Sequence, residues 1–461
     1  MSKKVLMAGV VVSLFLSMLA NGFAAVDNNP VIELNGIKLQ TVVHSDRGDV
    51  NIPLCAHMFT SPGLDMESGR NVYIPLRAVA EALGYRTDWS EKDRTVTVFK
   101  AGKNIMIDLK NNKITANDHA YYMSGDCSGT AADDAVIFEN RTYMGMGFFA
   151  DNFGLKVLWD RQGGKVRLES IKENAISIKT VKVDSEKEKL KITLQYPEIQ
   201  GLDDKTVQDG INSFFVKSAV NAANEGLQNA DEMARDTDGH TGSPNKCETY
   251  FDYRLKYNQN GLLSVVLTDY QYAGGAHGLT VQSSRTVNLK TGEAYELKDL
   301  FKGDADYVSL ISSTVRDQIN ERVKAGILPE NAITPFRTIK ADQDFYLSDH
   351  GMVVYFQQYE YFPYAAGIQE FSVDYSSLKD MLKSDFSFLN DDPKLLESYG
   401  TRNSLNAGET GRVILKGNPT TGYTWHYTIE NSDVVKPYSE KENRDSGMTG
   451  AGRTYKSCYN T

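Results

Sequence analysis

One segment near the start of the chain occurs twice at a constant spacing, and this repeat constrains the fold more than any other feature. The segment at residues 71–89 matches the segment at residues 141–159, always at an offset of 70 residues. The matched pairs are Tyr73 and Tyr143, Ala80 and Ala150, Gly84 and Gly154, and Trp89 and Trp159. Because a fixed offset across a whole unit is typical of a structural repeat, we expect two copies of one small supersecondary unit.

Each copy is predicted to form a strand, a short helix and a returning strand. Pro75 suits the first turn of the helix, where its missing N–H has no cost. Apolar residues at helical spacing give the helix one buried face, namely Leu76, Val79, Ala80 and Leu83. Gly84 can adopt the left-handed conformation that ends a helix, and residues 95–99 alternate as a strand. Glycines at 145 and 147 weaken the helix start in the second copy.

This repeat resembles the copper amine oxidase N-terminal-like domain of Gram-positive surface proteins, over residues 30–172. The resemblance implies a non-catalytic stalk that serves for spacing, wall contact or protein contact. The sequence has neither the Asn-Tyr-Asp/Glu motif of the quinone cofactor nor a His-x-His copper pair, so we expect no cofactor and no metal. Trp89 and Trp159 are either ligand platforms or core residues, and their repeat-equivalent positions favour the core.

The first 25 residues have the pattern of a secretory signal peptide. Lys3 and Lys4 precede an apolar run over residues 5–20, and Ala24 or Ala25 suits signal peptidase. An uncleaved anchor is the alternative, although the run is short for a membrane span. We therefore expect a secreted, extracellular or cell-wall associated protein with no transmembrane segment after cleavage. A net charge of −10 weighs against a nucleic-acid partner.

Four cysteines occur in the chain: Cys55, Cys127, Cys247 and Cys458. In an oxidising compartment four cysteines allow three disulfide connectivities. We favour a disulfide between Cys55 and Cys127, because both lie in the first domain. Cys247 is expected to be a free, buried thiol.

The middle of the chain, residues 175–390, is predicted to be α+β. Alternating residues predict strands at 176–183, 190–194, 250–257, 263–267 and 352–356, with a hairpin turn at Asn260-Gly261. Helical spacing predicts a helix through residues 207–219, capped by Asp203 or Asp204, and another through residues 308–319. The segment from Asn229 to Asn245 is rich in Asp, Gly and Thr and predicts a loop.

Two motifs rich in aromatic residues and glycine characterise this middle region. They are Tyr270-Gln-Tyr-Ala-Gly-Gly-Ala-His-Gly278 and Tyr359-Glu-Tyr-Phe-Pro-Tyr-Ala-Ala-Gly367. Together they resemble the paired extracellular domains of the lysozyme-sensing anti-sigma factor and of peptidoglycan deacetylases, here at residues 175–285 and 286–390. In the anti-sigma factor such domains bind lysozyme, whereas in the deacetylases they accompany a separate catalytic domain. The resemblance implies binding of lysozyme or peptidoglycan by Tyr272, Gly274, Gly275, His277, Tyr361 and Tyr364.

These residues also have simpler interpretations. A lone histidine in a glycine-rich turn more often hydrogen-bonds its own loop, and this applies to His277. Gly274, Gly275 and Gly278 can serve a positive φ or a close backbone approach. The Tyr355–Tyr364 stretch either binds a glycan or partner or forms a core strand with one wetted edge.

After a polar linker at residues 391–403, the tail has a hairpin-like pattern, with strands expected at 411–415 and 424–429. Between them, Asn418-Pro-Thr-Thr-Gly-Tyr-Thr-Trp425 resembles the first inhibitory loop of the chagasin family, which inhibits papain-like cysteine proteases. The resemblance implies an immunoglobulin-like β-sandwich over residues 404–461. It assigns protease binding to Asn418, Pro419, Thr420, Thr421, Gly422, Tyr423 and Trp425, with Gly450 and Gly452 in the second loop.

We expect this inhibitor module to be incomplete and weakened. The family needs about a hundred residues to close its sandwich, and Arg453 stands where its second loop usually has glycine. The third, Arg-Pro-Trp loop does not follow.

The sequence thus predicts a multidomain α+β protein with a repeated stalk domain, a middle region of two small domains and a partial β-sandwich. Its expected function is that of a secreted or cell-surface protein carrying a cysteine-protease inhibitor module. The alternative is a cell-envelope protein that recognises lysozyme or peptidoglycan through its middle domains. No nucleophile–base pair or metal cluster is evident in the sequence, so we expect no enzymatic activity.

Overall fold

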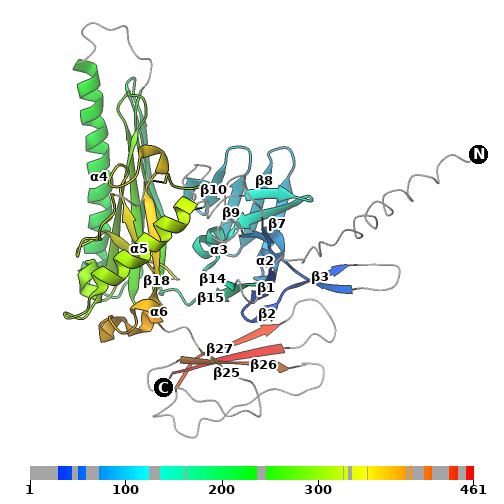
Figure 1. The fold of residues 1–461 in the computed structure, drawn as a ribbon. Coiled ribbons are helices and arrows are strands. Elements are labelled where there is room, and N and C mark those ends of the chain that lie inside the picture. Colours follow the sequence, from blue (N-terminus) through cyan, green and yellow to red (C-terminus); the bar gives the residue numbers. More distant parts are fainter. Residues whose placement is uncertain are drawn as a thin grey trace, which may run out of the picture.

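The protein is multidomain α+β, as predicted (Figure 1). The computed structural model describes residues 30–43, 50–58, 72–123, 135–160, 164–235, 246–324, 326–330, 335–349, 351–390, 394–396, 410–417, 436–444 and 453–460. Within these residues, the helices fall short of the length and apolar content that crossing a bilayer requires.

The first domain consists of short strands and two short helices. These are β1 (Val31–Leu34), β2 (Ile37–Lys38), β3 (Gln40–Val43), β4 (Val50–Pro53), β5 (His57–Met58), β6 (Val72–Pro75), α2 (Leu76–Ala82), β7 (Arg86–Ser90), β8 (Thr95–Lys100), β9 (Lys103–Asp108), β10 (Lys113–Ala116), β11 (His119–Tyr122), β12 (Ala135–Phe138), β13 (Arg141–Gly145), α3 (Met146–Phe153), β14 (Leu155–Asp160) and β15 (Lys165–Ser170).

Both copies form the predicted strand, helix and returning strand, the last being β8 or β15. A further strand, β7 or β14, follows each helix and pairs with the returning strand in a hairpin. The first strands of the copies, β6 and β13, pair antiparallel with Ile74 opposite Met144. Helices α2 and α3 follow directly, and the copies then diverge into separate sheets, ordered β11-β10-β9-β8-β7 and β14-β15-β1-β2. Both helices end at a left-handed glycine, with φ of 80° at Gly84 and 61° at Gly154.

The apolar faces of both helices enter one core. Val79 and its repeat equivalent Phe149 are both fully buried, and they belong to the same hydrophobic cluster. The helical spacing of the apolar residues therefore predicted the buried side of the first helix correctly, since Leu76, Val79 and Ala80 are buried.

The middle region is larger and contains two sheets. Its elements are β16 (Ser177–Glu186), β17 (Leu190–Gln200), α4 (Lys205–Arg235), β18 (Cys247–Gln259), β19 (Leu262–Tyr272), β20 (Leu279–Asn288), β21 (Ala294–Tyr295), η3 (Leu297–Leu300), α5 (Tyr307–Lys324), β22 (Phe345–Leu347), β23 (Gly351–Phe356), η4 (Tyr364–Ala366), β24 (Gln369–Asp374), α6 (Tyr375–Leu378) and η5 (Ser384–Asn390).

The larger sheet has the strand order β16-β17-β18-β19-β20-β21, and α4 lies along one of its faces (Figure 1). Phe215 on this helix packs with Val265 and Leu267 of β19. Asp204 caps the helix, since its carboxylate accepts the Thr206 N–H at 2.8 Å. The hairpin turn at Asn260-Gly261 has positive φ at both residues, 55° and 75°, as a type I′ turn requires.

Helix α4 is longer than the sequence predicted. The expected loop from Asn229 is wrong as far as Arg235, because the helix continues to that residue. Residues 229–235 contain no glycine or proline that would end a helix. Met233 also gives this last turn a tertiary contact, since the buried Cys247 thiol lies 3.7 Å from its sulfur. The predicted buried, free thiol at Cys247 is confirmed.

The smaller sheet, β22-β23-β24, shares its core with the larger one. Val266 of β19 packs with Tyr346, Val353 and Tyr355, and α5 covers the apolar cluster around Val354 and Phe371. The domain boundary expected between residues 285 and 286 falls inside β20. The two halves of the middle region are therefore joined by a continuous strand and a common core.

The tail contributes one more sheet, with the order β25-β26-β28-β27. Its strands are β25 (Lys394–Leu396), β26 (Thr410–Gly417), β27 (Lys436–Arg444) and β28 (Arg453–Asn460). The strand expected at residues 411–415 is present as β26. The returning strand expected at 424–429 lies outside the described residues.

Candidate functional site

The two aromatic motifs of the middle region, distant in sequence, meet in the fold. The ring of His277 stacks on the ring of Tyr364, with centroids 3.9 Å apart and planes inclined by 22°. Tyr359 completes the group, since its ring lies 5.6 Å from that of Tyr364 and its hydroxyl lies 3.4 Å from Nε2 of His277. We call His277, Tyr359 and Tyr364 the aromatic cluster.

Glycines shape the turn that presents His277. Gly274 has a φ of 84°, and a Cβ there would lie 2.8 Å from the sulfur of Met233. At Gly278 a Cβ would lie 2.4 Å from the ring of Tyr270. The structure thus accounts for these two glycines by conformation and close approach, as the simpler interpretation held. Gly275 has neither constraint, but its carbonyl accepts the Tyr272 hydroxyl at 2.9 Å.

Hydrogen bonds hold the histidine in one orientation. Nδ1 of His277 lies 3.0 Å from the Gly278 carbonyl, which also accepts the Tyr364 hydroxyl at 2.9 Å. Because a carbonyl oxygen can only accept, Nδ1 is the protonated nitrogen. The other ring nitrogen, Nε2, faces the Tyr359 hydroxyl. The prediction that His277 bonds its own loop is confirmed, and Tyr364 adds the contact that links the two motifs.

Tyr359 projects from this cluster. Its side chain is 57 % exposed, and its φ of 67° is rare for a residue other than glycine. Tyr361 lies elsewhere, because its ring packs edge-on against Phe356 at 5.0 Å and against Phe336 at 5.6 Å. The structure therefore brings His277 and Tyr364 together, leaves Tyr361 at the core, and adds Tyr359.

Two glutamines tie the motifs to each other. Gln358 Oε1 accepts the Thr280 N–H at 3.0 Å. Gln357 bonds the backbone of Gln282 in both directions, accepting the N–H at 3.0 Å and donating to the carbonyl at 2.7 Å. No sequence pattern singled out these glutamines, because their partners lie more than 70 residues away.

The aromatic cluster offers ring faces, an imidazole and tyrosine hydroxyls. Beneath it, burial raises the pKa of Tyr270, and the neighbouring Tyr364 adds to the rise, so this phenol stays neutral at physiological pH. Within the described residues, His, Cys, Asp and Glu side chains form no group of three or more that could hold a metal ion.

The residues expected to bind a protease lie outside the described residues. These are Asn418, Pro419, Thr420, Thr421, Gly422, Tyr423, Trp425, Gly450 and Gly452. The strands beside them are described: β26 ends at Gly417, and β28 begins at Arg453. Cys127 also lies outside, so its disulfide with Cys55 stays a prediction.

Four family models match successive parts of the chain. They are the copper amine oxidase N-terminal domain at residues 60–168, deacetylase PdaC at 183–280, a protein family of unknown function, DUF3298, at 298–376, and the chagasin family peptidase inhibitor I42 at 404–459. The predicted multidomain composition is thereby confirmed. The boundary between the second and third matches separates the two motifs that build the aromatic cluster.

Two relatives from Bacillus subtilis match the middle of the chain. The anti-sigma-V factor RsiV is 26% identical over 212 residues, which cover 45% of this chain and 70% of RsiV. The peptidoglycan-N-acetylmuramic acid deacetylase PdaC is 26% identical over 150 residues, which cover 32% of this chain and 31% of the deacetylase. The chain thus spans about a third of the deacetylase's length.

Solved structures of two DUF3298 family proteins are also similar. The protein from Bacteroides fragilis is 19% identical with a TM-score of 0.38, and the match covers 47% of this chain and 97% of that one. The protein from Pseudomonas aeruginosa is 13% identical with a TM-score of 0.36, covering 46% and 97%.

Proposed function

We propose that this chain is a secreted or cell-surface protein without catalytic activity, and that its middle region binds lysozyme through the aromatic cluster. The observation that carries the proposal is the convergence of two separately matched regions on one exposed cluster. Similarity to an anti-sigma factor over most of that relative's length supports it. So does the resemblance of both motifs to lysozyme-binding domains.

The geometry suits a protein partner. Tyrosine and histidine rings offer a large apolar area with polar edges, and residues of this kind dominate binding energy at protein interfaces. Hydrogen bonds and stacking fix His277 and Tyr364 before any partner arrives. Such preorganisation lowers the entropy cost of association. Peptidoglycan is the other partner that the resemblance implies, and it is a separate outcome of the test.

Biolayer interferometry of the mature chain on immobilised lysozyme tests this proposal. Tyr359→Ala should weaken binding about tenfold or more, as expected for a central aromatic contact. Tyr122→Ala is the matched control, since Tyr122 is 61 % exposed but belongs to the first domain. Equal affinity of wild type and Tyr359→Ala would contradict the role of the cluster. Binding to peptidoglycan sacculi but not to lysozyme would identify peptidoglycan as the partner instead.

A second function is favoured by the chagasin match at residues 404–459 and by the Asn418–Trp425 motif. We propose that this tail binds a papain-like cysteine protease weakly, because Arg453 replaces the glycine usual in the second loop. Papain should be titrated with the mature chain, and with the chain lacking residues 395–461. Tight, stoichiometric inhibition would contradict the expected weakness, whereas lysozyme binding should survive the deletion.

A further inference from the structure

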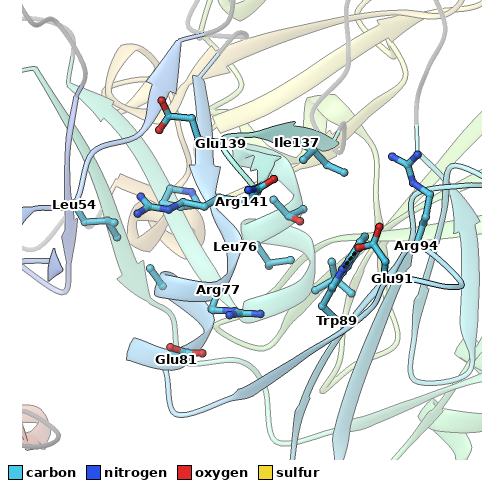
Figure 2. Close-up of a pocket in the computed structure, with 15 residues that line it drawn as sticks. Leu54, Leu76, Arg77, Glu81, Trp89, Glu91, Arg94, Ile137, Glu139 and Arg141 are labelled. Atoms are coloured by element: carbon cyan, nitrogen blue, oxygen red, sulfur yellow. Dashed lines mark hydrogen bonds between the residues drawn. The ribbon is translucent and has the colours of Figure 1, made fainter. Parts of the chain in front are cut away.

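A concave site lies in the first domain, far from the aromatic cluster in sequence. It is a cleft of about 810 Å³ between the tips of two hairpins, β7–β8 and β12–β13, with α2 along its base. Its floor is apolar, because Leu54, Leu76 and Val96 are buried there. In Figure 2, Trp89, Glu91 and Arg94 line one side, Glu139 and Arg141 line the other, and Leu76 lies between them. We call this site the hairpin cleft.

Trp89 forms an aromatic wall of the hairpin cleft. The side chain is half-buried, with part of it packed against the core and part lining the cleft. Its indole Nε1 donates a hydrogen bond of 2.8 Å to Glu91 (Figure 2). This bond satisfies the ring's polar atom and fixes its orientation, so the remaining ring surface is a preorganised apolar platform. Trp89 is therefore both a packing residue and a lining residue.

The charged rim of the cleft is balanced in sign. Three arginines and three glutamates line it: Arg77, Arg94, Arg141, Glu81, Glu91 and Glu139. Among the described residues, none of these six side chains forms an ion pair within 4.0 Å. The arginines and glutamates of the rim are therefore not paired with one another. Their formal charges sum to zero, which disfavours a polyanion or polycation as the ligand. Planar guanidinium and carboxylate groups instead offer paired donors and acceptors.

The rim is held by tight turns. Glu139 and Asn140 form the two-residue tip of β12–β13 with φ of 47° and 59°, and Arg94 closes the opposite loop with φ of 53°. Positive φ at both central residues is the type I′ geometry, which matches the twist of the flanking strands. The polar groups are thus carried on short hairpin tips, which favours a preformed site.

We propose that the hairpin cleft binds a neutral oligosaccharide, with one pyranose ring stacked on Trp89 and ring hydroxyls bonded by the arginines and glutamates of the rim. A pyranose has an apolar C–H face and equatorial hydroxyls, which suits an aromatic platform inside a ring of mixed charges. The cleft volume also lies in the range of about 300–1,000 Å³ typical of small-ligand sites. This site is separate from the aromatic cluster and does not depend on the proposed function.

Isothermal titration calorimetry of the mature chain tests the proposal with three probes: a β-1,4-linked N-acetylglucosamine hexamer, a cellulose hexamer and a sulfated glycan. We expect saturable binding of a neutral hexamer that is insensitive to salt. Trp89→Ala should weaken it about tenfold or more, whereas Trp89→Phe should retain most of it. Tyr122→Ala is the control, because this exposed tyrosine of the same domain does not line the cleft.

Three outcomes would overturn the proposal: no saturable binding of either neutral hexamer, unchanged affinity of Trp89→Ala, or salt-sensitive binding of the sulfated glycan alone. If circular dichroism shows that Trp89→Ala unfolds, the double variant Glu139→Gln and Arg141→Gln decides instead, since both side chains are exposed. This double variant should weaken binding about threefold or more, and unchanged affinity would refute the site. Lysozyme binding should be unaffected by any cleft variant, which separates the two proposals.

Discussion

The two repeats of the first domain share one sequence pattern but meet different surroundings. Glu81 on α2 lines the open hairpin cleft, whereas its equivalent Asp151 on α3 faces the middle region. There Asp151 lies 3.9 Å from Arg254 and 3.8 Å from Lys256, both on β18. The repeat pattern determines the backbone of each copy, but the neighbouring domain determines how its surface is used.

The second repeat carries residues for this contact that the first lacks. Asn152 is buried and donates to the Tyr121 hydroxyl at 2.8 Å and to the Phe148 carbonyl at 3.0 Å. Tyr121 in turn lies under the Arg254 guanidinium, 3.4 Å from the ring centre. The repeat equivalent of Asn152 is the exposed Ala82. The interface is thus built into α3 and not into α2.

The neighbouring strand β11 extends the same interface. Nε2 of His119 lies 2.7 Å from Asp252, and its ring stacks on Tyr253 with centroids 4.4 Å apart. The backbone N–H of Ala120 donates to Gln195 Oε1 at 3.1 Å. Among the described residues, these contacts link α3 and β11 of the first domain to β17 and β18 of the middle region.

The largest difference between the repeats should appear in their core. Phe149→Ala removes a fully buried ring and should lower the free energy of unfolding by about 3–5 kcal/mol. Val79→Ala, at the equivalent position, should cost about 2 kcal/mol because less volume is removed. Urea unfolding followed by tryptophan fluorescence measures both, since Trp89 and Trp159 lie in this domain. Equal losses would show that the two copies do not pack as described.

The stability of the protein should depend on pH through Asp349, whose carboxyl interacts with Asp151 of the second repeat. Burial, with Asp151 as the next contributor, raises the pKa of Asp349 from 3.8 to about 7. Between these values the folded state binds more protons than the unfolded state, so stability falls as pH rises and levels off above about pH 8. At about 1.36 kcal/mol per pKa unit, reduced for water penetration, the loss is about 3 kcal/mol.

Asp349→Asn should abolish most of this pH dependence and stabilise the protein at pH 8. Urea unfolding of both proteins at pH 5, 6.5 and 8, followed by circular dichroism, isolates the effect from that of other carboxylates. A wild type that becomes more stable between pH 5 and pH 8 relative to the variant would contradict the assignment.

The next largest effect on stability is expected at the buried amide of Asn152 in the second repeat. Asn152→Leu removes two hydrogen bonds and leaves the Tyr121 hydroxyl without this partner, at a cost of about 2 kcal/mol. The mirror change in the first repeat, Ala82→Asn, alters an exposed position and should stay within about 0.5 kcal/mol. Urea unfolding followed by tryptophan fluorescence measures both variants. Comparable losses of unfolding free energy would contradict the difference between the two copies.

The smallest effect is expected at the helix carboxylates. Asp151→Asn should cost less than about 1 kcal/mol, because the ion pairs of Asp151 with Arg254 and Lys256 are long and partly exposed to solvent. It should also lower the pH midpoint of the transition, since Asp151 contributes to the raised pKa of Asp349. Glu81→Gln is the matched control and should leave that midpoint unchanged. A midpoint that responds to both variants would argue against a specific interface.

Local pattern predicted much of this fold. The apolar spacing of residues 76–83, the left-handed glycines after both helices and the turn at Asn260-Gly261 all depend on neighbours within a few residues. Polar composition was misleading at the last turn of α4, where a tertiary contact contributes to the helix. The fold places Met233 of that turn against Cys247, and no local pattern records such a contact.

The candidate sites were less accessible to sequence reasoning. Within the Tyr355–Tyr364 stretch the structure buries Tyr355, Phe356 and Phe362 and exposes Tyr359, although all four are aromatic. The hairpin cleft combines residues from four separate segments between Leu54 and Thr142. No spacing rule connects such residues, because their proximity arises from the pairing of β6 with β13.

By itself, the sequence determined the repeated unit, the helices and hairpins of the middle region and the order of the four family-matched regions. These features follow from period, turn chemistry and short motifs, which act between residues close in the chain. Only the tertiary structure decided that His277 meets Tyr364, that Trp89 lines a cleft, and that α3 is docked while α2 is open. Each of these contacts depends on which helix and strand faces pack together over long sequence separations. The local residue pattern does not specify that packing.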